Sequence, residues 1–325
     1  MTVLLTGAAG FIGYHVAEAL LARGERVIGI DNLNAYYDVR LKQARLDLLA
    51  RHSGFGFRQM DVADREAVFA LFREQRDMRR IVHLAAQAGV RYSMTDPYAY
   101  VQSNVMGHLV MMEAARQQEG LEHLVYASSS SVYGANTKLP FAETDPVDAP
   151  VSLYAATKRA DELMSHAYTH LFGLPQTGLR FFTVYGPWGR PDMAYYSFAL
   201  AIARGEPVTV YDEGRLRRDF TYVDDIVAGI LGCLDRPPPA GGAARVLNIG
   251  NHRAEEVRTL IALLEAELGR KALIRHAPRP AADVEATFAD VDAIAALTGY
   301  APATPLAVGI PRFVAWFRAW HGINA

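Results

Sequence analysis

The sequence predicts an α/β fold: a doubly wound parallel sheet with a smaller, discontinuous C-terminal domain. Three observations lead to this prediction. Short apolar runs alternate with amphipathic stretches through the first half of the chain, a spacing typical of parallel sheets. A glycine-rich turn follows the first apolar run, and after about residue 183 the alternation gives way to loops rich in Gly and Pro.

The expected elements follow in chain order. Buried strands are predicted at 3–5, 26–30, 55–60, 80–85 and 123–128. Helices are predicted between them at 12–23, 35–50, 64–76 and 97–118, and a long helix at 153–172 precedes a strand at 177–182. Further helices are predicted at 194–204, 223–234, 255–268, 290–297 and 306–320, and the run 246–250 is expected to return to the sheet. We therefore expect 1–182 with about 219–250 to form the larger domain, and 183–218 with 251–325 the smaller one.

Composition excludes several classes of partner. The chain has 325 residues, 51% of them hydrophobic, and a formal net charge of −2, which does not favour nucleic acid or an anionic membrane surface. No apolar run approaches the roughly 20 residues of a membrane helix, and the N-terminus does not resemble a signal peptide. The chain has a single cysteine, Cys233, and so cannot form an intrachain disulfide. The absence of disulfides is typical of proteins in a reducing compartment. We expect a soluble cytoplasmic protein with no metal site.

The stretch TGAAGFIG (6–13) places Gly7, Gly10 and Gly13 directly after the first strand. The first glycine permits a tight turn, the second lets the backbone approach a pyrophosphate, and the third lets the helix pack close to the sheet. The start of the helix, with Phe11 and Ile12, then faces the phosphate charge. A tight turn without a ligand is the alternative, but the position in the first βα turn favours a dinucleotide site.

Asp31 ends the second predicted strand. A carboxylate there can bind both hydroxyls of an adenosine ribose and would repel a 2′-phosphate, which favours NAD over NADP. Capping of the next helix is the alternative. Asp61, after the third strand, is a candidate for the adenine edge, and the stretch 84–93 could line the pyrophosphate and nicotinamide ribose. Further contacts with the dinucleotide are expected from Asn32, Val62, Leu84, Ala85 and Ala86.

Tyr154 and Lys158 lie four residues apart at the start of the long helix and therefore share one helical face. A free phenol ionises near pH ~10, and a nearby ammonium favours the phenolate. Tyr154 could then take a proton from a substrate hydroxyl as hydride leaves for NAD. The alternative is a pair of helix-surface residues without a catalytic role.

Seven stretches together resemble the extended short-chain dehydrogenases/reductases, specifically the nucleotide-sugar epimerases, over essentially the whole chain. They are TGAAGFIG, DNLNAYYD, HLAAQAGVRYS, YASSSSVYG, SLYAATK, LRFFTVYGPWGRPDM and RRDFTYVDDI. Within that family the resemblance is strongest to UDP-glucuronate 4-epimerases. It implies a Rossmann-like fold, a tightly bound NAD that each turnover regenerates, and conversion of UDP-glucuronate to UDP-galacturonate.

The resemblance also implies catalytic roles. Ser129 hydrogen-bonds the reacting 4-oxygen, Tyr154 is the base, and Lys158 lowers the pKa of Tyr154 and binds the nicotinamide ribose. Oxidation gives a 4-keto sugar, which swings about its pyrophosphate link before hydride returns to the opposite face. NAD ends the cycle as it began, as a prosthetic group does.

Ser130 and Ser131 follow Ser129 and distinguish this chain from related enzymes. In related 4,6-dehydratases the two positions carry Asp and Glu, which eliminate water. In related UDP-glucuronate decarboxylases a glutamate occupies the second position. The serines therefore argue against both chemistries.

Oxidation of a uronate at carbon 4 creates a β-keto acid, which loses carbon dioxide easily. Several hydroxyl and backbone donors could bind the carboxylate, stabilise its charge and hold the breaking bond out of line with the carbonyl π system. We expect Ser129, Ser130, Ser131 and Thr183 to do this, with Arg190 as a further partner. Galactose-type epimerases carry an asparagine at the Thr183 position. The alternatives are an ordinary polar turn for Ser130 and Ser131 and a surface salt bridge for Arg190.

The UDP end needs a cationic group. Arg218, in RRDF, occupies the position at which the family has a phosphate-binding arginine, and Asp283 resembles the family's residue near the uridine ribose. The family usually has Pro-Gly-Asp-Val there, whereas this chain has AADV at 281–284, which leaves the role of Arg279 open. Residues 192–198 are expected to line the uracil pocket.

The resemblance implies a homodimer, because the helices at 97–118 and 153–172 correspond to those that pair across dimers in this family. Val105, Leu109 and Met112 would contact the partner helix. The alternative is that these faces pack only within the subunit.

Three other functions stay open beside the leading one. The first is a 4-epimerase of a neutral UDP-hexose such as UDP-glucose or UDP-N-acetylglucosamine. The second is a decarboxylase that forms UDP-xylose, against which Ser131 argues. The third is a catalytically silent NAD-binding regulator, against which the presence of Tyr154, Lys158 and Ser129 argues.

Overall fold

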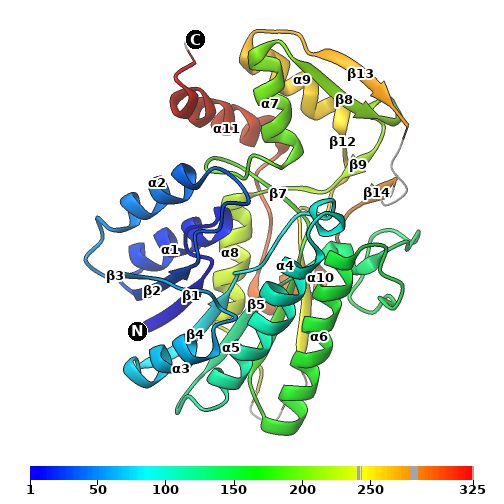
Figure 1. The fold of residues 1–325 in the computed structure, drawn as a ribbon. Helices are drawn as coiled ribbons and strands as arrows, with labels where there is room; N and C mark the ends of the chain where they lie inside the picture. Colours follow the sequence, from blue (N-terminus) through cyan, green and yellow to red (C-terminus); the bar gives the residue numbers. More distant parts are fainter. Residues whose placement is uncertain (240–241, 243, 279–284, 324–325) are drawn as a thin grey trace.

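The computed structural model describes residues 1–239, 242, 244–278 and 285–323. Its centre is a seven-stranded parallel sheet with strand order β11-β6-β5-β4-β1-β2-β3 (Figure 1). The strands are β1 (Thr2–Thr6), β2 (Arg26–Asp31), β3 (Phe55–Gln59), β4 (Met78–His83), β5 (His123–Ser129), β6 (Gln176–Phe181) and β11 (Arg245–Ile249). The strand order reverses between β1 and β4, which is the topological switch point of a Rossmann-type sheet. The predicted fold class is confirmed.

Helices cover both faces of this sheet, so its central strands are continuous apolar runs rather than alternating ones. All five residues of β1 are buried. On one face α1 contacts α2 and α8, and on the other α5 contacts α3 and α6 (Figure 1). The helices are α1 (Phe11–Ala22), α2 (Val39–Leu49), α8 (Val223–Leu234), α3 (Arg65–Glu74), α5 (Gly107–Ala115) and α6 (Leu153–Phe172).

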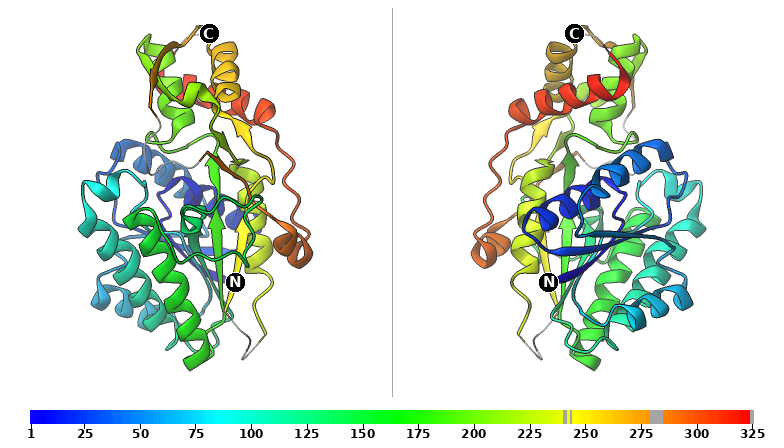
Figure 2. Two further views of the ribbon diagram at one scale, coloured as in Figure 1. Left: turned by 90° about the vertical axis from the view of Figure 1, so that its right-hand side faces the viewer. Right: turned by 90° about the vertical axis from the view of Figure 1, so that its left-hand side faces the viewer.

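A smaller group of elements lies beyond the carboxyl ends of the sheet strands (Figure 2). It contains α7 (Ala194–Arg204), α9 (Val257–Leu268), α11 (Leu306–His321) and the parallel pair β8 (Pro207–Tyr211) and β13 (Leu273–Ala277). In α11 the residues Ile310, Phe313, Val314 and Phe317 follow helical spacing and are buried, which forms the apolar stripe that packs on α9. Full burial of such a side chain contributes about 1.5–3 kcal/mol. This stripe fixes α11 over the small group.

Short strands connect the two parts of the molecule. β7 (Thr183–Tyr185) pairs with β10 (Phe220–Tyr222), and β9 (Arg217–Arg218) lies between β12 (Glu255–Glu256) and β14 (Ala286–Thr287). The helix α10 (Asp292–Thr298) returns beside α8. The return of 246–250 to the large sheet, as β11, is confirmed, whereas the short strands were not predicted because two or three residues carry no readable period.

Several predicted helices differ in their bounds, and for three of them the structure shows how. The helix expected at 35–50 begins only at Val39, because the Asp38 carboxylate accepts a hydrogen bond from the Arg40 amide and caps it. The helix expected at 255–268 begins at Val257, because residues 255–256 pair with β9. The stretch expected at 97–118 is α4 (Pro97–Tyr100), a π-helical segment at 101–106 and α5, which ends at Ala115.

The prediction that Met112 contacts a partner subunit is wrong. It is completely buried, and its sulfur accepts a hydrogen bond from the Ser165 hydroxyl of α6 in the same subunit. Val105 and Leu109 are half-buried. In the described part of the chain, no helix has both the length and the apolar character needed to cross a membrane.

Candidate active site

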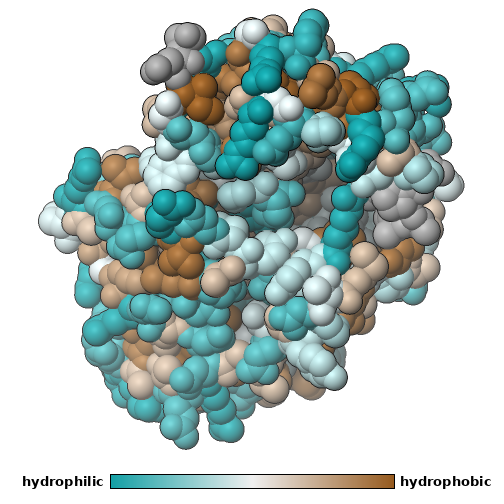
Figure 3. All heavy atoms as spheres, turned by 45° about the horizontal axis from the view of Figure 1, so that its top comes forward, coloured by the Kyte–Doolittle hydropathy of each residue, from teal (hydrophilic) through white to brown (hydrophobic). Residues whose placement is uncertain are grey.

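A cavity of about 1130 Å³ lies between the carboxyl ends of the sheet strands and the small group of elements. The space-filling view shows the surface hollowed between these two parts (Figure 3). Its lining comes from the turns after β1, β2, β4 and β5, from the first turns of α6, and from β7, α7 and β8. Ligands of open α/β sheets bind at this edge, next to the switch point.

The turn between β1 and α1 has no room for side chains on its glycines. Gly7 has φ +72°, a left-handed conformation, and a Cβ on Gly13 would lie 2.0 Å from the Gly7 carbonyl oxygen. Gly7, Gly10, Phe11, Ile12 and Gly13 all line the cavity. No described side chain caps the start of α1, so the helix N-terminus is open to an anionic ligand. This turn fits the pyrophosphate of a dinucleotide.

Asp31, at the end of β2, is buried and lines the same cavity. Its Oδ1 accepts a hydrogen bond from the Leu33 amide at 2.8 Å and lies 3.7 Å from the Lys42 ammonium. Burial lowers the pKa of Lys42, and the charge of Asp31 opposes that effect. Asp38, not Asp31, caps α2, so the helix-cap alternative for Asp31 does not apply. A carboxylate at this place suits a ribose diol.

Asp61 does not line the cavity, although Asn32 and Val62 do. Its two carboxylate oxygens accept hydrogen bonds from the Asn32 side-chain amide at 2.9 Å and from the Ala63 backbone at 2.8 Å. Asp61 therefore fixes the orientation of Asn32. After β4, the residues Leu84, Ala85 and Ala86 line the cavity.

The four serines at the end of β5 have different environments. Ser128 is buried and donates a 2.6 Å hydrogen bond to Glu162, which is also bound by Arg180 at 2.8 Å. Burial would raise the pKa of Glu162, but the hydrogen bonds and charge of Arg180 outweigh burial and lower it. The Ser129 hydroxyl oxygen accepts a hydrogen bond from the Ser131 amide at 3.1 Å. That amide is therefore not available to a ligand, whereas no described group accepts a hydrogen bond from the hydroxyls of Ser129, Ser130 and Ser131.

Tyr154 and Lys158 lie in the first turns of α6, which Ser152 caps through the Ala155 amide. The Lys158 ammonium donates to the Ala127 carbonyl at 2.9 Å and to Asp161 at 3.1 Å. Both charged side chains are buried, and burial raises the pKa of Asp161 to about 6 against the opposing charge of Lys158. Ser129, Tyr154 and Lys158 all line the cavity, so the structure brings the three together.

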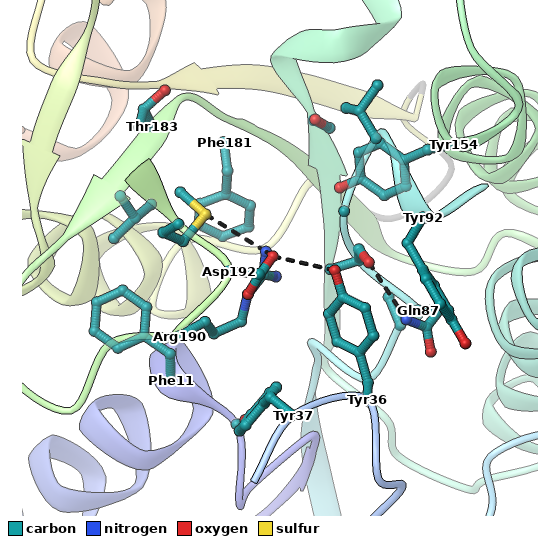
Figure 4. Close-up of a pocket in the computed structure, with 18 of the residues that line it drawn as sticks. Phe11, Tyr36, Tyr37, Gln87, Tyr92, Tyr154, Phe181, Thr183, Arg190 and Asp192 are labelled. Carbon is teal, nitrogen blue, oxygen red and sulfur yellow. Dashed lines mark hydrogen bonds and ion pairs between the residues drawn. The ribbon is translucent and has the colours of Figure 1, made fainter. Parts of the chain in front are cut away.

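Thr183, in β7, and Arg190, in the loop between β7 and α7, also line the cavity. Two hydrogen bonds of 3.1 and 2.9 Å join the Arg190 guanidinium to Asp192, and the Tyr36 hydroxyl points at the same carboxylate at 3.2 Å (Figure 4). Burial lowers and the charge of Asp192 raises the pKa of Arg190, with a net rise. The predicted alternative, a salt bridge, thus exists, but inside a ligand-sized cavity.

Arg218 and part of the stretch 192–198 also line the cavity. The Arg218 guanidinium donates to the backbone carbonyls of Arg217 and Glu285. Within 192–198, Tyr195 and Tyr196 point into the core and are buried, so only Asp192, Met193, Ala194, Ser197 and Phe198 line the cavity. Asp283 and Arg279 lie outside the described residues.

Several lining residues were not singled out from the sequence, and four of them carry polar groups of interest: Tyr36, Lys42, Gln87 and Arg91. The Arg91 guanidinium lies 5.2 Å from the centre of the Tyr211 ring in β8. Gln87 and Arg91 belong to the stretch 84–93, so their place after a strand was the available signal. Tyr36 and Lys42 were hidden because the helix was expected to begin at residue 35. Among the described residues no three His, Cys, Asp or Glu side chains could hold a metal ion.

A sequence model of the NAD dependent epimerase/dehydratase family matches residues 3–250. The chain belongs to this family. A relative from Rhizobium meliloti, named probable UDP-glucuronate 4-epimerase, is 45% identical and is covered to 97%, with 98% of this chain aligned. The resemblance to NAD-dependent epimerases is thereby confirmed.

Solved structures of family members are similar over the whole chain. The UDP-glucuronic acid 4-epimerase of Bacillus cereus, in complex with UDP-glucuronic acid and NAD, has a TM-score of 0.91 at 32% identity, covering 98% of this chain and 100% of its own. A UDP-glucose 4-epimerase from Thermotoga maritima, with UDP-glucose, has a TM-score of 0.88 at 30% identity, covering 99% of this chain and 100% of its own. Family members that act on acid and on neutral sugars thus share this fold.

Proposed function

We propose that the protein converts UDP-glucuronate to UDP-galacturonate by NAD-dependent 4-epimerisation through a 4-keto intermediate, without decarboxylation. One observation carries the proposal: three hydroxyl side chains, Ser130, Ser131 and Thr183, line the same cavity as Arg190 and Tyr154. Neither position 130 nor 131 is acidic. The name of the Rhizobium meliloti relative supports the same substrate.

The dinucleotide is proposed to bind along the turn after β1, with its adenosine ribose on Asp31. When bound, NAD accepts a hydride from carbon 4 of the sugar and returns it. Asn32 is oriented for the adenosine end by Asp61. The remaining proposed contacts are Gly7, Gly10, Phe11, Ile12, Gly13, Val62, Leu84, Ala85, Ala86 and Lys158, which all line the cavity.

Tyr154 is proposed as the base that takes the proton of the 4-hydroxyl and later returns a proton to the 4-oxygen. Lys158 favours the phenolate by its positive charge, and its bonds to Ala127 and Asp161 fix that charge one helical turn after Tyr154. Ser129 donates to the 4-oxygen. A hydroxyl has one donor and two acceptor positions, so the bond that Ser129 accepts from Ser131 leaves its hydrogen for the substrate.

The sugar carboxylate is proposed to bind the hydroxyls of Ser130, Ser131 and Thr183 and the Arg190 guanidinium. Charge-assisted hydrogen bonds are about twice as strong as neutral ones, and they stabilise the carboxylate that decarboxylation would destroy. Because several donors fix its orientation, the bond to carbon 5 stays out of line with the 4-keto π system. The β-keto acid therefore survives until hydride returns.

The UDP end is proposed to lie toward Arg218, with the uracil near Ser197 and Phe198 and the ribose near Asp283. In this placement the protein has two domains. Residues 1–182 with about 219–250 form the proposed NAD-binding domain, and 183–218 with 251–325 form the proposed UDP-sugar-binding domain.

We also propose a homodimer formed by α4, the π-helical segment and α6. Tyr98, Val101, Met106 and Leu163 on these helices are 84%, 49%, 43% and 55% exposed. Large apolar side chains gathered on neighbouring helices favour a protein partner over solvent. They replace Met112 as the proposed contact residues.

The second candidate is epimerisation of a neutral UDP-hexose. The similarity to the Thermotoga maritima UDP-glucose 4-epimerase favours it. The Arg190–Asp192 pair is compatible with it, because a neutral sugar needs no free cation. Against it stands Thr183, at the position where galactose-type epimerases carry an asparagine.

The test compares kcat/KM for UDP-glucuronate, UDP-glucose and UDP-N-acetylglucosamine. We expect the acid to exceed both neutral sugars by at least about tenfold, the effect of one charge-assisted hydrogen bond. Ser131→Glu should lower kcat/KM for the acid by about 100-fold through like-charge repulsion, and Thr183→Asn by about tenfold, with more decarboxylated product. Thr209→Asn, a matched change at a residue of β8 that also lines the cavity, should affect all three substrates equally. Higher activity on a neutral sugar, or unchanged rates and products in the Ser131 and Thr183 variants, would refute the proposal.

A further inference from the structure

Arg45, on α2, is a completely buried cation that the proposed reaction does not use. Its guanidinium donates to four neutral oxygens. They are the carbonyls of Ala9 at 2.7 Å, Trp188 at 2.5 Å and Gly189 at 3.3 Å, and the Tyr37 hydroxyl at 2.8 Å. None of its partners in the described part of the chain is a carboxylate, and its buried Nε has no hydrogen-bond partner there. A buried charge without a counter-ion is costly, so a function is expected of it.

The carbonyl partners of Arg45 belong to two segments whose neighbouring residues line the cavity. Ala9 belongs to the turn between Gly7 and Gly10, where the proposed dinucleotide pyrophosphate binds. Trp188 and Gly189 directly precede Arg190, the proposed partner of the sugar carboxylate. One planar guanidinium therefore joins two segments that are about 180 residues apart in the sequence, and its fork of donors suits several acceptors at once.

The segment before Arg190 needs such external contacts to keep its conformation. Trp188 has φ +60°, a left-handed backbone conformation that costs an ordinary residue about 1–2 kcal/mol and persists only where its surroundings enforce it. A second contact, from His15 of α1 to the Pro187 carbonyl at 3.0 Å, lies next to it. Burial lowers the pKa of His15 to about 4, so this second contact is neutral, and Arg45 supplies the only charge in the pair.

We propose that Arg45 is a positioning residue that couples the dinucleotide turn to the segment carrying Arg190, so that binding at either site favours binding at the other. Its hydrogen bonds fix the Ala9 carbonyl on one side and the Trp188 and Gly189 carbonyls on the other. The coupling must be reciprocal, as linkage requires.

The chain provides its own probe of this segment. All three tryptophans of the chain lie in one cluster. The centre of the Trp188 ring is 5.3 Å from that of Trp316 and 5.6 Å from that of Trp320, both in α11. Intrinsic fluorescence therefore reports on the backbone that Arg45 binds. The inference rests on the proposed function for the dinucleotide at the turn after β1 and for the sugar carboxylate at Arg190.

The experiment uses purified holoprotein with Arg45→Lys, Arg45→Met and the control Arg40→Met. Arg40 lies on the same helix, but its side chain is 87% exposed and pairs with Asp38. Three quantities are measured: amide hydrogen exchange of 186–193, the NAD content of the protein, and the dissociation constants of UDP-glucuronate and of UDP from tryptophan fluorescence. Lysine keeps the charge but lacks the fork of donors that binds the carbonyls of both segments at once. Arg45→Lys therefore tests the coupling even if Arg45→Met does not fold.

In Arg45→Lys we expect exchange in 186–193 to be at least about tenfold faster, with less bound NAD. The dissociation constant of UDP-glucuronate should rise about tenfold, as for the loss of one hydrogen bond to a charged group, and that of UDP less than about twofold. Arg40→Met should match the wild type. Wild-type exchange in Arg45→Lys, or equal weakening of UDP and UDP-glucuronate, would overturn the inference. If the wild type fails to bind UDP-glucuronate, the proposed substrate is wrong, while exchange and NAD content still decide the role of Arg45.

Discussion

Ser128 and Ser129 are neighbours in the sequence, but they point to opposite sides of β5. The Ser128 hydroxyl donates to the buried Glu162, whereas the Ser129 hydroxyl oxygen caps the turn that follows. Successive side chains of a strand alternate between its two faces, so one serine stabilises the core and the next is available to a ligand. All four serines of the run line the cavity, but the Ser128 hydroxyl is bound to Glu162, whereas no described group accepts a hydrogen bond from the other three hydroxyls.

Replacement of Tyr154 by Phe tests the proposed base directly. We expect the variant to keep its fold and its bound NAD, because the phenol oxygen makes no hydrogen bond that the structure shows within the described residues. Its kcat should fall by about 10³, within the usual contribution of general acid–base catalysis. The measurement is turnover of UDP-glucuronate together with the NAD released from denatured protein.

Tyr168→Phe is the matched control for that prediction. Tyr168 lies on the same helix and donates to Glu113 rather than facing the cavity, so its loss should leave kcat unchanged. Wild-type turnover in Tyr154→Phe would remove Tyr154 from the mechanism.

At the scale of single residues, motifs identified the glycines of the first turn and the Tyr-x-x-x-Lys pair, because their function depends on local spacing. Sequence could not show that Arg190 is paired with Asp192, or that Arg45 binds Trp188, since the first needs side-chain orientation and the second a contact across the fold. Asp61 stays a prediction for the adenine edge, and the sequence could not show that its carboxylate also binds the Asn32 side chain.

At the scale of elements, helix α6 combines the most functions. Its first turns carry Tyr154 and Lys158, its middle carries Asp161 and Glu162, and its outer face carries the exposed Leu163. The helix was predicted with its observed bounds because Ser152 caps it and Gly173 ends it in a left-handed conformation. The π-helical segment at 101–106 was not predictable, because it differs from an α-helix only in its hydrogen-bond pattern.

Strand β5 contains a histidine that should make stability depend on pH. His123 is buried and bonds to Thr177 of β6 at 2.8 Å and to the Leu234 carbonyl of α8 at 3.2 Å. Burial lowers its pKa to about 4. Between about pH 4 and pH 6.5 the His123 imidazole is therefore protonated in the unfolded chain but neutral in the folded one. The contribution of neutral His123 to the free energy of unfolding is complete above about pH 6.5 and is lost as the pH falls toward 4.

We expect His123 to cost about 2 kcal/mol of the free energy of unfolding between pH 7.5 and pH 5. Urea unfolding at both pH values measures this loss in the wild type and in His123→Gln. The variant is expected to be less stable at pH 7.5 but to lose less stability on acidification. An identical loss in both proteins would show that His123 does not contribute to the pH dependence.

At the scale of the whole molecule, the alternation of strands and helices predicted the large sheet, because each buried strand is a readable apolar run. The small sheets connect segments far apart in the sequence, and their strands of two to five residues depend on partners that no local pattern shows. The cavity lies between the large sheet and the smaller group of elements. Motifs therefore predicted many of the residues that line it, but not how the two parts come together to enclose it.

The proposed dimer makes a prediction at this scale. Leu163→Glu should convert a homodimer into a monomer, because it places a charge in the apolar surface of α6. Leu273→Glu, at a similarly exposed leucine of β13 (57% exposed), should remain dimeric. Size-exclusion chromatography with light scattering measures both. A monomeric wild type, or equal behaviour of the two variants, would contradict the proposed interface.

The most direct test of the proposed reaction is proton NMR of the purified protein with UDP-glucuronate and no added NAD. The account predicts new signals of a sugar with an axial 4-hydroxyl, UDP-galacturonate, without release of carbon dioxide. That result would show epimerisation, a resident cofactor and protection of the β-keto acid together. Formation of UDP-xylose, an accumulating 4-keto sugar, or an unchanged spectrum would contradict it.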